Sequence, residues 1–135
     1  MIARSDMRQI AQARLQDARA LRDRGRYDGA VYLCGYAIEV ALKARICLTL
    51  KWAGFPETNK EFEGKQSFRR HNLDLLLTFS GVETMIQTRY LLEWSAVTGW
   101  TPELRYQVAG NVTRSKANQM IAGAAVLVKL LCRNC

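Results

Sequence analysis

Apolar residues recur every three or four positions along residues 27–52, in the most regular stretch of the chain. The recurring positions are Ala30, Leu33, Cys34, Ala37, Ile38, Ala41, Leu42 and Cys47. Such spacing predicts a helix with one broad buried face. Glu39, Lys43 and Arg45 lie in the same stretch, and polar groups on a buried helix need partners. We therefore expect the core and any chemistry of the protein to meet on this helix.

Four more segments show helical periodicity or helix-end signals. The predicted helices run from Ser5 or Asp6 to about Arg24, from about His71 or Asn72 to Gly81 as a short helix, from about Glu83 to Ala96, and from Thr113 or Arg114 almost to Cys135. The turn at residues 23–26 is short, so the first two long helices should pack antiparallel. The sequence thus predicts an all-α, up-and-down bundle of four main helices plus one short helix, in a single domain over residues 1–135.

A polar segment interrupts the helical pattern at residues 53–70. It contains Gly54, Pro56, Asn59 and Gly64, which favour turns. Loops longer than about 12–15 residues are uncommon in compact domains, and they are often functional or mobile. We therefore expect a long, flexible loop here.

The net charge of +8 is distributed unevenly along the chain. Residues 1–26 carry +4 and residues 105–135 carry +5, whereas residues 27–104 carry −1. If the fold brings both basic segments to one shared side, that side would attract polyanions such as RNA, DNA or nucleotide phosphates. The alternative is a solvated basic surface that keeps the protein soluble.

Composition excludes several classes of protein. Apolar residues make up 49% of the chain and charged residues 24%, as in ordinary globular domains. The most apolar windows are interrupted by charges or are too short to span a membrane. The first ten residues lack the apolar core of a secretory signal. A cytoplasmic location is expected.

The four cysteines do not form a recognisable metal site. Cys34 and Cys47 fall within one predicted helix, where free buried thiols are expected. Cys132 and Cys135 form a single C-x-x-C, and a zinc ion would need two further ligands. The only histidine, His71, has no paired spacing with another cysteine. We expect no metal and no cofactor.

The order of several short motifs resembles the small prokaryotic HEPN domains over nearly the whole chain. The most specific segment is Y-A-I-E-V-A-L-K-A at residues 36–44, and H-N-L at residues 71–73 and R-Y at residues 105–106 support it. The resemblance implies a helical bundle that forms a homodimer and binds nucleotide or RNA. It also implies a toxin–antitoxin or defence pair, with a minimal nucleotidyltransferase-like protein as the partner.

The resemblance also implies a possible activity, because many HEPN proteins are metal-independent ribonucleases. Those members carry Arg, then four to six residues, then His, on a late helix. That motif is absent here: Gly64, Lys65 and Gln66 precede His71 at the corresponding distances, and no histidine follows Arg114. This departure argues against ribonuclease activity.

The candidate functional residues form two groups. His71 follows Arg69 and Arg70 at a predicted helix start, where an anion could bind, and Lys43 and Arg105 are further candidate phosphate contacts. His71 is also the candidate catalytic acid or base; the alternative is that it caps the helix and packs. Glu39 and Lys43 are spaced to form a helical ion pair.

We interpret that ion pair mainly as structural rather than catalytic. A tyrosine hydroxyl would join Glu39 and Lys43, and the expected network comprises Tyr36, Glu39, Lys43 and Tyr106. Arg105 and Tyr106 would complete this network or face a ligand.

Three functions remain open from the sequence. The first is a HEPN-like module that binds nucleotide or RNA without catalysis. The second is a divergent metal-independent ribonuclease that uses His71 with Arg69 or Arg70. The third is a structural scaffold that only binds a partner protein.

Overall fold

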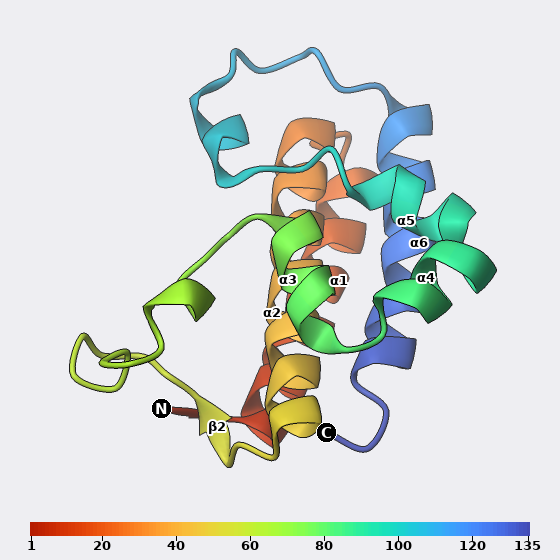
Figure 1. The fold of residues 1–135 in the computed structure, drawn as a ribbon. Coiled ribbons are helices and arrows are strands. Elements are labelled where there is room, and N and C mark those ends of the chain that lie inside the picture. Colours follow the sequence, from red (N-terminus) through yellow and green to blue (C-terminus); the bar gives the residue numbers. More distant parts are fainter.

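The computed structural model describes all 135 residues and is mostly helical, as the sequence predicts (Figure 1). The α-helices are α1 (Arg4–Asp23), α2 (Tyr27–Leu50), α3 (Leu73–Ser80), α4 (Glu83–Arg89), α5 (Leu91–Val97) and α6 (Arg114–Leu131). Two 3-10 helices, η1 (Gln66–Phe68) and η2 (Pro102–Tyr106), lie in the connections. Two short antiparallel strands, β1 (Ile2–Ala3) and β2 (Gly54–Phe55), pair with each other.

Helix α2 lies at the centre of the fold and packs against α1, α3 and α6. Of the apolar positions that predicted this helix, all but Leu33 are buried. Helix α2 returns antiparallel to α1 after the turn at Gly25. The φ of Gly25 is +75°, a conformation that glycine adopts at little cost. The antiparallel hairpin predicted from the sequence is therefore present.

The number of helices differs from the prediction of four main helices plus one short one. The segment predicted as one helix is broken at Tyr90, where φ is −130° and ψ is 31°, so that α4 and α5 are separate. After the break, α5 packs along α6, and both Ile86 of α4 and Trp94 of α5 reach the core. Periodicity alone did not reveal this bend because both halves keep helical spacing.

The start of α1 also differs from the prediction. Its N-cap is Ala3 rather than Ser5 or Asp6, and no side chain caps it. The reason is that Ile2 and Ala3 pair with Phe55 and Gly54, so the helix begins directly after strand β1.

The segment at residues 53–70 is anchored to α2 by aromatic side chains. Phe55 and Phe62 are buried, and the Trp52 ring lies 5.0 Å from that of Phe68, centre to centre. The segment holds β2 and η1 within an otherwise irregular path, so it is more ordered in secondary structure than the long loop expected from its composition.

The basic segments at the two ends of the sequence lie side by side in the fold. Helix α1 and helix α6 are in contact and run in opposite directions (Figure 1). Residues 25–29 and 109–113 line one cavity at one end of the bundle, and Arg8 donates to the Cys135 carbonyl at the other end. The two basic segments are therefore adjacent, as the expectation required, and a single basic side formed from both stays a prediction.

None of the helices has the length and continuous apolar sequence needed to cross a bilayer.

Candidate functional site

A buried carboxylate joins the two candidate groups of residues. Glu39 of α2 has a side chain only 4% exposed, and its Oε1 is hydrogen-bonded to His71 Nδ1. The same oxygen lies 3.5 Å from Lys43 Nζ, one turn further along α2. The predicted Glu39–Lys43 pair is therefore present, and His71 rather than a tyrosine hydroxyl completes it. A buried carboxylate needs such partners because desolvation of an isolated charge is costly.

Asn72 fixes the position of His71 relative to α3. Its side-chain Oδ1 accepts a hydrogen bond from the backbone N–H of Leu75 at 3.0 Å, so Asn72 is the N-cap of this helix. Asparagine is among the most favourable residues at this position. His71 consequently lies just outside the helix and does not cap it, and its side chain is 63% exposed.

A cavity of about 440 Å³ lies beside His71, between α1, α2 and the segment at residues 53–70. We call it the β2–α3 cavity; it is lined by Ile2, Met7, Ile10, Val40, Lys43, Phe55, Pro56, Glu57, Phe62, Arg69, Arg70 and His71. Four of the five candidate phosphate contacts thus line one cavity. Its size falls within the range of small-molecule sites, which are typically about 300–1,000 Å³.

The three cations of the β2–α3 cavity differ in how firmly they are held. Arg69 donates to Asn59 Oδ1 at 2.7 Å, and its guanidinium lies 5.3 Å from the centre of the Phe62 ring. Lys43 lies 5.2 Å from the centre of the Phe55 ring, in addition to its contact with Glu39. Arg70 is exposed, and its side chain has neither a hydrogen bond nor an ion pair. Arg70 is therefore the cation of the cavity that is free to bind an anion.

The apolar floor of this cavity was not foreseen from the sequence. Val40, Phe55 and Phe62 lie in it, and the last two come from a segment that the turn residues marked as a loop. The available signal was the presence of three phenylalanines, Phe55, Phe62 and Phe68, in an otherwise polar stretch. An apolar floor with a cationic rim can hold a ligand that is apolar at one end and anionic at the other.

Arg105, the fifth candidate phosphate contact, does not line the β2–α3 cavity. Its Nη1 donates to the Pro102 carbonyl at 3.0 Å, and its guanidinium lies 4.6 Å from the centre of the Tyr106 ring. Hydrogen bonding with Tyr106 raises the pKa of Arg105, and Tyr32 contributes to the same shift.

The tyrosines form a contact of their own rather than joining Glu39 to Lys43. The hydroxyls of Tyr32 and Tyr36 lie 3.5 Å apart, and this hydrogen bond, together with burial, raises the pKa of Tyr36 to about 12. Tyr106 is 76% exposed and reaches these residues only by way of Arg105. The expected network of Tyr36, Glu39, Lys43 and Tyr106 is thus divided into two parts.

A second pocket, of about 390 Å³, adjoins His71 on the side of η2. We call it the α3–η2 pocket; it is lined by His71, Asn72, Leu73, Asp74, Thr98, Trp100, Thr101, Pro102 and Glu103. It is mainly polar, and Asp74 accepts a hydrogen bond from the Thr98 hydroxyl at 2.8 Å. Because His71 lines both hollows, its imidazole lies at the boundary between a cationic cavity and a polar pocket.

All four cysteines are free thiols, and the prediction of free buried thiols at Cys34 and Cys47 is confirmed. Burial raises the pKa of Cys34 and of Cys132 to about 12 and that of Cys47 to about 11. They are protonated at neutral pH and therefore weak nucleophiles and weak metal ligands. No three His, Cys, Asp or Glu side chains lie together as a metal site would require.

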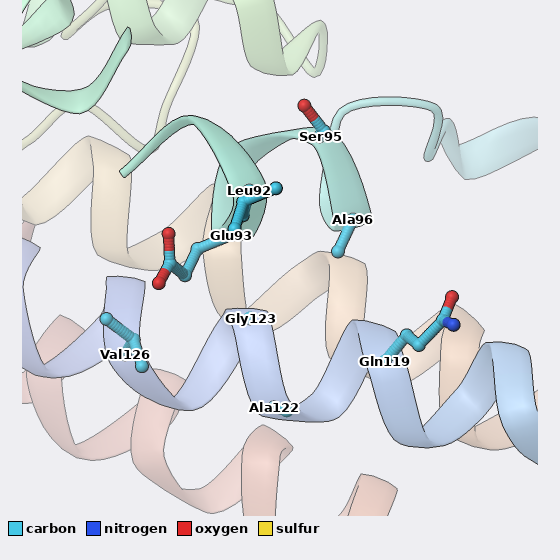
Figure 2. Close-up of a pocket in the computed structure, with 8 residues that line it drawn as sticks. All are labelled: Leu92, Glu93, Ser95, Ala96, Gln119, Ala122, Gly123 and Val126. Carbon is cyan, nitrogen blue, oxygen red and sulfur yellow. The ribbon is translucent and has the colours of Figure 1, made fainter. Parts of the chain in front are cut away.

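A groove of about 560 Å³ lies between α5 and α6, and its lining differs from that of the two hollows beside His71. Figure 2 shows α5, with Leu92, Glu93, Ser95 and Ala96, lying over Gln119, Ala122, Gly123 and Val126 of α6. The groove contains no cation, and Leu92 is 84% exposed beside it. An apolar surface of this kind suits protein contact better than phosphate binding.

Comparison with protein families gives one match. The family model described as HEPN domain matches residues 5–59, a span that includes α2 with Glu39 and Lys43. Searches of curated proteins and of solved structures each found no match. The family match ends before Arg69, Arg70 and His71, so their place beside Glu39 is a finding of the structure. At the family level the match indicates a nucleotide- or RNA-related module, or one of a toxin–antitoxin type. The resemblance seen in the sequence is confirmed: residues 5–59 of this chain match the HEPN domain family.

Proposed function

We propose that this chain binds nucleotide or RNA through phosphate contacts in the β2–α3 cavity. The observation that carries the proposal is that Lys43, Arg69, Arg70 and His71 line one cavity although the sequence separates Lys43 from the others. Phosphate groups are bound most effectively by such convergent cations. The middle of the chain has a net charge of −1, so this cationic rim is a local arrangement rather than a result of the overall charge.

The residues of the cavity have three roles in the proposed binding. Arg70, which has no partner, and the exposed edge of His71 contact the phosphate. Arg69 is held by Asn59 and Phe62, so it provides a fixed positive charge that needs little reorganisation. The apolar floor at Val40 and Phe55 accommodates a base or a sugar face.

The proposal is tested by fluorescence polarisation with a labelled single-stranded RNA and with a fluorescent mononucleotide. The double variant Arg69→Gln/Arg70→Gln should weaken binding of the preferred ligand by tenfold or more. A matched control, Arg24→Gln/Arg89→Gln, removes the same charge from exposed positions outside the cavity. Equal losses in the two double variants would mean that net charge, and not the cavity, binds the ligand.

A metal-independent ribonuclease is the second candidate, and the Glu39–His71 hydrogen bond favours it. A carboxylate on Nδ1 leaves Nε2 able to accept a proton from a 2′-hydroxyl, as a general base. RNA incubated with the protein in a chelator should then be cleaved, and His71→Ala should abolish the cleavage. Cleavage that persists in His71→Ala would exclude His71 as the base.

The partner proposal rests on the family alone. We propose that the chain acts in a toxin–antitoxin or defence pair with a nucleotidyltransferase-like protein. Co-expression with such a protein encoded beside it, followed by purification through a tag on one chain, should recover both. Recovery of the tagged chain alone would count against the pair.

A further inference from the structure

The hydrogen bond that His71 Nδ1 makes to Glu39 leaves the other ring nitrogen, Nε2, free. The carboxylate is bound to Nδ1, which fixes the neutral tautomer with the proton on that nitrogen. The lone pair is then on Nε2, at the opposite edge of the ring. Because the Glu39 side chain is 4% exposed and that of His71 is 63% exposed, the ring reaches from the core to the surface. Nε2 has no hydrogen-bond partner in the protein, whereas Nδ1 is bound to Glu39.

The groups around His71 Nε2 favour attack on a phosphoryl group over cleavage of an RNA chain. Cleavage of an RNA chain needs a base and also an acid that protonates the leaving oxygen. The β2–α3 cavity contains one imidazole, and its carboxyl group, Glu57, is more than half exposed. Glu39 is already bound to Lys43 and His71. One oriented imidazole is sufficient, however, for attack on a phosphoryl group whose leaving group departs without a proton.

We propose that His71 accepts a phosphoryl group at Nε2 from a small phosphoryl donor with a good leaving group, of the acyl phosphate or phosphoramidate class. The Nε2 lone pair forms the new N–P bond while the bond from phosphorus to the leaving group breaks. Its electron pair departs on acetate from an acyl phosphate, or on ammonia from a phosphoramidate whose nitrogen is already protonated. The Nδ1 proton stays on the ring, and the Glu39 carboxylate neutralises the positive charge that the imidazole gains. Arg70 binds the phosphoryl oxygens.

The inference rests on the proposed function, because it assumes that the β2–α3 cavity admits phosphate. It also gives the cavity a means of regulation. A phosphoryl group on His71 would bring a charge of about −1.5 to −2 into the cavity and occupy Arg70. Phosphorylated protein should therefore bind RNA or nucleotide less tightly than unmodified protein.

The test uses phosphoramidate as the donor and intact-protein mass spectrometry as the readout. One phosphoryl group should be added, map to His71, and be labile in acid but stable in alkali. His71 should react faster than N-acetylhistidine at the same concentration, because any exposed imidazole reacts slowly with this donor. Glu39→Gln should slow the labelling roughly tenfold or more, since it weakens the orienting contact.

If Glu39→Gln does not fold, variants at the exposed residues Arg70 and Arg24 still test the inference. Arg70→Gln should slow the labelling, whereas Arg24→Gln should not change it. Labelling at the rate of N-acetylhistidine, unaffected by Arg70→Gln, would overturn the inference. If RNA or nucleotide still binds to that protein in the polarisation assay, only the inference fails. Absence of both labelling and binding would overturn the proposed function as well.

Discussion

Glu39 and His71, 32 positions apart in the chain, share a hydrogen bond that connects the buried face of α2 to the exposed start of α3. The bond gives the one deeply buried carboxylate of the protein a partner at the surface. It also makes the orientation of the only imidazole depend on the central helix. Any ligand that contacts His71 is thereby linked to the packing of α2.

The first prediction concerns the stability that this contact provides. Glu39→Gln keeps the size of the side chain but removes the charge that Lys43 and His71 share. We expect the free energy of unfolding to fall by about 1–3 kcal/mol, as for the loss of a charged hydrogen-bond partner at a buried site. Denaturant unfolding measures this free energy for each variant. The exposed Glu63→Gln should change stability by less than about 0.5 kcal/mol. Similar values for both variants would contradict a structural role for Glu39.

The second prediction concerns Gly35, whose position in α2 allows Trp100 to pack directly on the helix. A Cβ at Gly35 would lie 2.1 Å from the Trp100 indole, which also donates from Nε1 to the Tyr32 carbonyl at 3.1 Å. Gly35→Ala should therefore destabilise the fold by about 1–3 kcal/mol or more, because a well-packed indole must shift. At Gly99 a Cβ would meet nothing within 4 Å, so Gly99→Ala serves as the control. A harmless Gly35→Ala would mean that Trp100 is not held in this position.

The third prediction follows from the raised pKa values of the buried thiol of Cys34 and of the partly buried Tyr36, whose hydroxyl is hydrogen-bonded to Tyr32. The pKa of Cys34 and that of Tyr36 are each about 12 in the folded protein, above the ordinary values of about 8.5 and 10. A group whose folded pKa is raised stabilises the fold fully below its unfolded pKa, and this stability is lost as the pH rises. Unfolding midpoints in denaturant should thus decline from about pH 8.5 towards pH 12. In Cys34→Ala the decline should be shallower, and an unchanged slope would show that this thiol is not protected.

The fourth prediction addresses the homodimer that the family resemblance implies, which we propose is formed by the α5–α6 groove (Figure 2). Leu92 is 84% exposed beside a floor of small residues, so two copies related by a two-fold axis could each insert this side chain into the other. Leu92→Glu should convert a dimer into a monomer in light scattering. Val108→Glu, which changes an equally exposed apolar residue elsewhere, should leave the dimer intact. A dimer that survives Leu92→Glu uses another surface.

Much of the helical framework could be predicted from the sequence because it depends on local signals. These signals are the α2 periodicity, the short turn at residues 23–26 and the start of α6 at Thr113 or Arg114. Each concerns residues within a few positions of one another. The bend at Tyr90 and the pairing of β1 with β2 depend on tertiary contacts, which short-range patterns do not contain. Three phenylalanines in a polar segment were the one local sign that residues 53–70 pack on the core.

The candidate site was predictable in its residue types but not in its assembly. Lys43, Arg69, Arg70 and His71 could be named from charge and from the family resemblance. That Glu39 is bound to His71, and that Arg105 lies apart, depends on how the segment at residues 53–70 returns to α2. The segment packs against the core through Phe55 and Phe62. These contacts join residues far apart in the sequence, so the spacing of residues does not predict them.

The most direct test of the account is the salt dependence of RNA binding by Arg70→Gln and by Arg24→Gln, each compared with the unmodified protein. Each phosphate contact that is lost reduces the slope of log affinity against log salt concentration by about one. We predict that Arg70→Gln weakens binding and lowers the slope by about one, while Arg24→Gln leaves both nearly unchanged. Identical slopes and affinities for the two variants would contradict phosphate binding in the β2–α3 cavity.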